Sequence, residues 1–165
     1  MKVGVKSLNL REKAQNWLNY SLNDPLVKIL SNNSNLTKIQ LETLLIDVLA
    51  ANISEKSLKY DEKAKIRILA VSRGAFNRSL RQARKNVTQS IYTILLLGYL
   101  GILEEISLEP YLEAANKLKT YINTQREIVK KKAKEEQLKT VALLHEELKK
   151  SLEELSNPRR ISKKM

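Results

Sequence analysis

The sequence contains no cysteine, and it has only four glycines and three prolines in 165 residues. Without cysteine the chain has no disulfide framework, no thiolate nucleophile and no cysteine-based zinc site, which is typical of an intracellular protein. The scarcity of glycine and proline leaves little turn chemistry, and the abundance of Leu, Ile, Lys, Glu and Ala favours long helices over sheets. We therefore expect an all-α protein.

Long apolar segments are also missing. The N-terminus has no apolar stretch of the length found in secretory signals. The longest apolar run, residues 91–103, is interrupted by Gly98 and Gly101 and is too short to span a membrane. We expect this run to be buried in the core of a cytoplasmic protein with no membrane span, nucleoid-associated if the source is prokaryotic.

The sequence lacks the usual signatures of catalysis. It has no phosphate-cradling glycine loop, no nucleophile elbow and no metal-ligand cluster. Its paired glutamates, at residues 104–105, 146–147 and 153–154, are neighbours in sequence and therefore point to different faces of a helix, the wrong arrangement for a shared acid–base site. We expect a protein that is not an enzyme and has no catalytic residues, metal, cofactor or small-molecule substrate.

Acidic residues are absent from one long stretch. Residues 63–103 contain eight Lys or Arg and no Asp or Glu. Residues 61–103 carry eight basic and two acidic side chains, so half of the formal net charge of +12 lies in about a quarter of the chain. A helix with unpaired positive charge on one face and an apolar stripe on the other is suited to dock on a core and meet a polyanion, with nucleic acid the leading candidate.

Two short patterns predict where helices begin. Asp24 followed by Pro25 has the pattern of an N-cap with proline at the first helical position. Thr37 followed three residues later by Gln40 has the pattern of a capping box. A further helix is expected from Asp61, as its cap, to about Ser72.

The segment KIRILAVSRGAFNRSLRQARKNV, residues 65–87, consists of an apolar helix, a short turn with a small residue and a basic helix rich in Arg, Asn and Gln. Over about residues 62–90 it resembles the helix-turn-helix of homeodomain-like DNA-binding proteins. In such families the second helix lies in the major groove of DNA. The resemblance implies base contacts and phosphate contacts from this helix. The residues implied to contact bases are Arg73, Asn77, Arg78, Arg81 and Gln82, and those implied to contact phosphates are Arg84 and Lys85.

Helical spacing gives independent support for this basic helix. An apolar stripe with steps of three or four residues runs through Phe76, Leu80, Ala83, Val87, Ile91 and Leu95. The polar residues fill the opposite side, and Arg, Asn and Gln are the side chains that can bind base edges bidentately. The alternative is a plain solvated face, but such a face would interleave Glu with Lys at i,i+4 spacing.

Residues 107–156 are predicted to form one long helix with coiled-coil character, followed by a basic disordered tail over residues 157–165. Two heptad blocks are separated by the charged segment KKKAKEEQ. The first block is expected to pack on the helical domain of residues 1–106, and the second to pair with another chain. The predicted homodimer interface consists of Leu138, Val141, His145, Leu148, Leu152 and Leu155. The alternatives are antiparallel packing within the chain and a lone solvated helix.

Together these features predict a dimeric DNA-binding protein that uses a basic recognition-type helix and acts as a transcription regulator or chromosome-associated factor. Duplex DNA is favoured over single strands because the chain has only one Trp and one Phe to stack on bases. The alternative is a non-catalytic helical scaffold or assembly subunit whose basic face binds an acidic protein or an anionic membrane.

Overall fold

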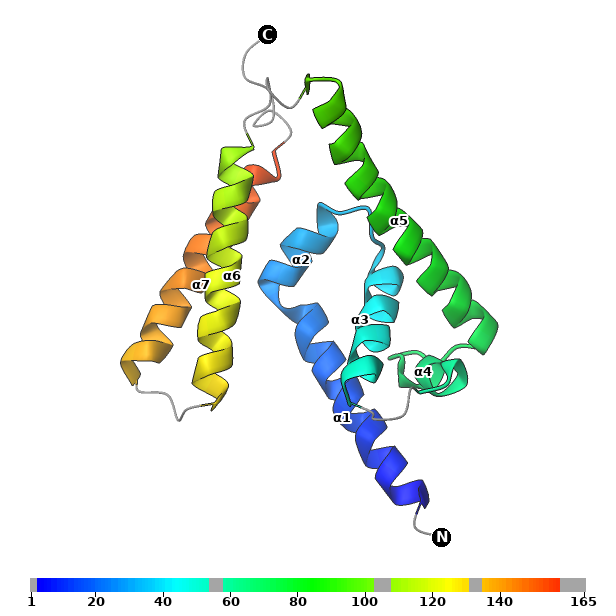
Figure 1. The fold of residues 1–165 in the computed structure, drawn as a ribbon. Coiled ribbons are helices and arrows are strands. Elements are labelled where there is room, and N and C mark those ends of the chain that lie inside the picture. The colour runs from blue at the N-terminus through cyan, green and yellow to red at the C-terminus, as the bar shows by residue number, and fades with distance from the viewer. Residues whose placement is uncertain (1–2, 54–57, 103–107, 131–134, 158–165) are drawn as a thin grey trace. The chain divides into compact units, whose positions relative to one another are not determined.

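A computed structural model describes residues 3–53, 58–102, 108–130 and 135–157 of the chain, and these residues form helices without any strand (Figure 1). The all-α prediction is therefore confirmed. The helices are α1 (Val3–Asn23), α2 (Pro25–Asn32), α3 (Lys38–Ile53), α4 (Tyr60–Ile66), α5 (Arg73–Tyr99), α6 (Glu109–Lys130) and α7 (Glu135–Leu155). The chain divides into two compact units, residues 1–93 and residues 94–165.

Local side chains fix two of the predicted helix starts. The Asp24 carboxylate accepts hydrogen bonds from the backbone N–H groups of Leu26 and Val27, at 2.8 and 3.1 Å, with Pro25 at the first helical position of α2. At α3 the Thr37 hydroxyl accepts from the Gln40 N–H at 3.3 Å, while the Gln40 side chain accepts from the Thr37 N–H at 3.0 Å. Both caps satisfy N–H groups that have no partner within the helix.

The helix α4 differs from its prediction. It runs from Tyr60 to Ile66. The Glu62 carboxylate accepts from the Lys59 N–H at 2.8 Å, which fixes the N-cap at Lys59, two residues before Asp61. Asp61 therefore lies inside the first turn and is not the cap. Residues 67–72, which the sequence predicts to be helical, form an irregular connector to α5.

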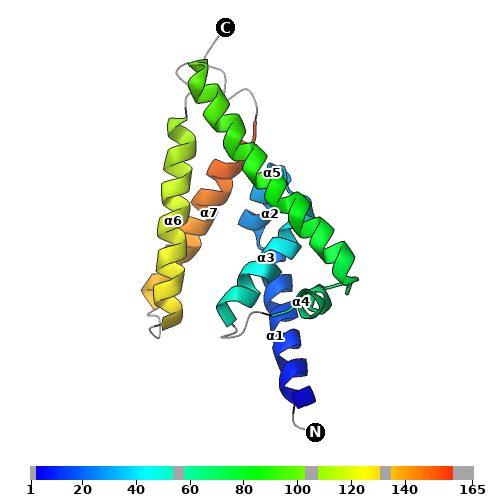
Figure 2. The same ribbon diagram turned by 45° about the vertical axis from the view of Figure 1, so that its right-hand side comes forward.

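The first unit is built around a small apolar core in which α1, α3, α4 and the first half of α5 meet. Its buried members are Ala14, Leu18, Ile46, Ala64, Ile66, Phe76 and Leu80. Helices α1, α3 and α4 contact one another directly, and both views show the N-terminal end of α5 beside α4 (Figures 1 and 2). The ring of Phe76 lies 6.4 Å from the ring of Tyr60, centroid to centroid.

The second unit contains a helical hairpin. The Tyr111 hydroxyl, near the start of α6, donates to the carbonyl of Leu155 at the end of α7, over 3.1 Å. Ten residues further along α6, the ring of Tyr121 lies 5.8 Å from that of His145, ten residues back along α7. The two helices therefore run antiparallel and pack along their length, as Figure 2 also shows.

Two sequence expectations need correction here. Residues 107–156 are not one continuous helix, because α6 and α7 turn back on each other; residues 131–134 between them lie outside the described residues, as do residues 158–165 of the predicted tail. The apolar run from residue 91 is also not buried. From Ile91 to Ile102 the structure leaves Leu95 60% and Tyr99 89% exposed.

Candidate nucleic-acid interface

The basic helix α5 is attached to the first unit by one face of its N-terminal half. Phe76, Leu80 and Ala83 are buried there, with Phe76 and Ala83 fully inaccessible to solvent. The Ser72 hydroxyl accepts from the Ala75 N–H at 3.2 Å and caps the start of the helix. The predicted apolar stripe therefore docks on the core as far as Ala83, whereas Val87, the next member of the stripe, is 40% exposed.

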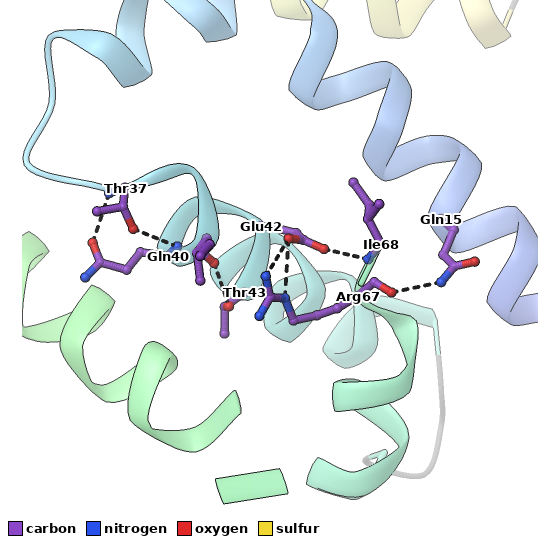
Figure 3. Close-up of polar contacts among 8 residues, drawn as sticks. Gln15, Thr37, Gln40, Glu42, Thr43, Arg67 and Ile68 are labelled. Carbon is purple, nitrogen blue, oxygen red and sulfur yellow. Dashed lines mark hydrogen bonds and ion pairs between the residues drawn. The ribbon is translucent and has the colours of Figure 1, made fainter. Parts of the chain in front are cut away.

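The connector that leads into α5 is held by a buried polar network (Figure 3). The Arg67 guanidinium donates to the Glu42 carboxylate of α3 through Nη2 at 3.0 Å and Nε at 3.3 Å. The same carboxylate accepts from the backbone N–H of Ile68 at 2.7 Å, and Gln15 of α1 donates to the carbonyl of Arg67 at 2.9 Å. The Gln15 bond holds the connector to α1, and the Glu42 bonds hold it to α3. Both charged side chains are buried, and the connector they hold leads directly into α5.

The arrangement α4–connector–α5 bears on the helix-turn-helix resemblance. The second helix is basic, as the resemblance implies, but the first helix, YDEKAKI, is mostly charged, and the apolar residues 68–71 lie in the connector. The first helix has only seven residues, and the connector spans residues 67–72, longer than the three- or four-residue turn typical of the motif. The resemblance therefore stays a prediction about function and is not a description of this geometry.

Three of the predicted contact residues form an outward-facing line of charge. At about 100° per residue, Arg78, Arg81 and Lys85 fall within an arc of roughly 60° on the side of α5 opposite the buried residues. All three are exposed, and none has an ion pair with any residue in the described part of the chain. We call these three residues the basic stripe. Arg73, at the first position of α5, is exposed on its flank.

Arg84, a predicted phosphate contact, is differently placed. Its Nη2 lies 2.7 Å from Oδ2 of Asp47 on α3, and Lys63 of α4 binds the other carboxylate oxygen at 2.8 Å. Burial by itself would raise the pKa of Asp47, but the hydrogen bonds and positive charges of Lys63 and Arg84 outweigh it and hold that pKa below its ordinary value. The charge of Arg84 is therefore shared with an acid inside the protein.

The two amide side chains predicted to contact bases, Asn77 and Gln82, are also not fully free to bind DNA. Gln82 donates through Nε2 to the Asn86 side chain at 2.9 Å, and Asn77 is half-buried. Asn86 itself donates to the carbonyl of Asn35 at 2.7 Å and to the Gln40 side chain at 3.1 Å, which joins α5 to the loop before α3 and to the first turn of α3. Sequence reasoning missed this role because Asn86 lies in a polar run with nothing to distinguish it from solvated neighbours.

The predicted dimer residues are largely used inside the chain. Val141, Leu148 and Leu152 are buried in the α6–α7 hairpin, and His145 and Leu155 are half-buried there; Leu138 is exposed. This is the antiparallel packing within the chain that the sequence left open as an alternative. An apolar stripe can be covered from within without the loss of translational freedom that association of two chains costs.

Two further properties bear on function. Within the described ranges, no three His, Asp or Glu side chains gather in a group that could hold a metal ion. None of the helices described is long and apolar enough to cross a membrane. Comparison of the chain with protein-family models, with curated proteins and with solved structures gives no match.

Proposed function

We propose that this chain binds duplex DNA through the basic stripe of α5 and acts by binding rather than by chemistry. The observation that carries the proposal is the stripe itself, since Arg78, Arg81 and Lys85 are exposed, have no acidic partner among the described residues and lie opposite the buried face. Cations left unpaired on a rigid helix attract a polyanion, and each phosphate they neutralise releases counterions.

The dimensions of the stripe suit a duplex. Arg78 and Lys85 are seven residues apart, which is about 10 Å along an α-helix. The major groove of B-DNA is about 12 Å wide and admits one helix, with phosphates along both rims. The buried network of Glu42 and Arg67 holds the start of α5, so the stripe is presented by a fixed element rather than by a loop.

The side chains on this face favour phosphate binding over base reading. Adenine is recognised by an Asn or Gln side chain that is free to make a bidentate contact. Neither amide here is fully free, because Gln82 bonds to Asn86 and Asn77 is half-buried. Arginine and lysine remain, and phosphate contacts position a protein without carrying sequence information. We therefore favour a chromosome-associated protein with weak sequence preference over a sequence-specific regulator.

The experiment is a fluorescence anisotropy titration with duplex DNA at several salt concentrations. Three phosphate contacts give a slope of log K against log salt of about −2.7, and a fourth from Arg73 gives about −3.6. The triple variant R78Q/R81Q/K85Q should lose most of this slope. The matched control R11Q/K13Q/K28Q removes the same charge from exposed sites on α1 and α2 and should lose little.

Equal losses from both triple variants would refute the proposal, because the interaction would then follow net charge and not the stripe. Tighter binding to structured RNA than to duplex DNA would reassign the ligand. Weak sequence preference is tested by competition between duplexes of random sequence and duplexes enriched for binding to this protein. If the enriched duplexes bind more than about 10³ times more tightly than the random ones, the lower end for specific DNA-binding proteins, the architectural role is contradicted and a regulator is favoured.

A further inference from the structure

The second half of α5 carries an exposed apolar face. Its members lie within an arc of roughly 140° at about 100° per residue. They are Ile91, Tyr92, Leu95, Leu96 and Tyr99, and each is more than half exposed. We call these five residues the apolar face. Such side chains on the outside of a helix are unfavourable in water unless something covers them.

We propose that the apolar face is the interface at which two copies of this chain pair, with their α5 helices antiparallel. This proposal concerns self-association and does not depend on DNA binding. Five large side chains exposed to this degree leave on the order of 600 Å² per chain, the upper end of what a monomer usually shows and enough, doubled, for a specific interface.

The composition of the face suits a protein partner. From Asn86 to Ile102 the chain has no charged residue, so pairing requires no ion to leave water. Two tyrosines, Tyr92 and Tyr99, lie on the face, and interface cores are depleted in charge and enriched in aromatic residues.

Other occupants fit less well. An anionic membrane surface binds helices whose basic and apolar residues lie on opposite faces of the same stretch, whereas in α5 the charges come first and the apolar face follows further along. Among the α6 and α7 residues whose exposure the structure describes, the large exposed apolar side chains form no matching stripe. Leu112 and Ile122 lie about 80° apart around α6, and Leu138 and Leu143 about 140° apart around α7.

Charge selects the antiparallel arrangement. A parallel pair would bring the two basic stripes to the 8–10 Å separation of packed helices, where like charges repel. In an antiparallel pair centred on Leu95, each Lys85 lies about 15 Å from the centre, and the two copies of Lys85 lie about 30 Å apart. That separation is nearly four times the Debye length of about 8 Å at physiological salt.

The first test is the mass of the full chain by sedimentation equilibrium over a range of concentrations. The expected mass is twice the 18.9 kDa of one chain. Leu95→Asp places a charge at the centre of the interface and should weaken dimerisation at least about 100-fold, while helicity by circular dichroism stays unchanged because this side chain is exposed. The control Leu143→Asp changes a leucine on α7 that is 69% exposed, against 60% for Leu95, and should leave the dimer intact.

The second test uses the absence of cysteine in the chain. Leu95→Cys, near the expected two-fold axis, should form a disulfide-linked dimer on mild oxidation. Thr88→Cys should not, because its two copies lie about 21 Å apart in the antiparallel pair. A monomeric full chain at 100 µM, or equal disruption by Leu143→Asp, would overturn the proposal. Crosslinking through Thr88→Cys would show a parallel pair and refute the antiparallel arrangement.

Discussion

The buried pair of Glu42 and Arg67 gives the sharpest expectation for stability. Both side chains are less than a tenth exposed, and the Glu42 carboxylate accepts three hydrogen bonds, two from Arg67 and one from the Ile68 N–H. Glu42→Ala leaves the guanidinium buried without its counter-charge and the Ile68 N–H without its acceptor. Loss of one partner of such a pair costs about 3–5 kcal/mol, a large share of the 5–15 kcal/mol that stabilises a typical protein.

Two further variants separate charge from hydrogen bonding. Glu42→Gln keeps an acceptor for the Ile68 N–H but weakens two charge-assisted bonds, so we expect a cost of about 2 kcal/mol. Replacing both Glu42 and Arg67 with Leu removes both buried charges and leaves only the Ile68 N–H unpaired, at about 1–3 kcal/mol. The double variant should therefore be more stable than Glu42→Ala.

Urea unfolding followed by tryptophan fluorescence measures these values, because Trp17 on α1 is the only tryptophan and reports on the first unit. The full cycle also needs Glu42→Leu and Arg67→Leu alone. Two residues in direct contact should couple. The reasoning would be refuted if the loss of unfolding free energy in the double variant equalled the sum of the losses in the two single Leu variants to within about 0.5 kcal/mol. A cost below 1 kcal/mol for Glu42→Ala would likewise show that the pair is solvated.

Two other expectations follow from the packing. Because the pKa of Asp47 is lowered in the folded state, its ion pairs stabilise the fold above the ordinary pKa of 3.8, and this contribution is lost as the pH falls through the folded-state pKa. Asp47→Asn should flatten the loss of stability below about pH 4 in acid titrations followed by Trp17 fluorescence; an unchanged profile would contradict the assignment. Leu148→Ala opens a cavity in the α6–α7 hairpin and should cost about 2–5 kcal/mol, with a loss of helicity by circular dichroism that precedes any change at Trp17. A simultaneous change in both signals would show that the two units unfold together.

The sequence by itself determined the features that depend on neighbouring residues. The all-α class follows from composition, and the caps at Asp24 and Thr37 follow from side chains that bond to N–H groups two or three residues away. The outward direction of Arg78 and Arg81 follows from helical spacing, because the residues that face the core are fixed by the same period.

The tertiary structure decided everything that depends on distant partners. No pattern in the sequence shows that Arg84 contacts Asp47, which is 37 residues away. Nor does any pattern show that Arg67 contacts Glu42 and thereby helps to hold an irregular connector where a helix was predicted. The heptad stripe around Leu148 likewise predicts that this face of α7 is buried, but it does not identify the partner. In the structure the partner is α6 of the same chain. Apolar periodicity fixes which face is buried, whereas only the packed chain fixes the partner, because hydrophobic burial is not directional.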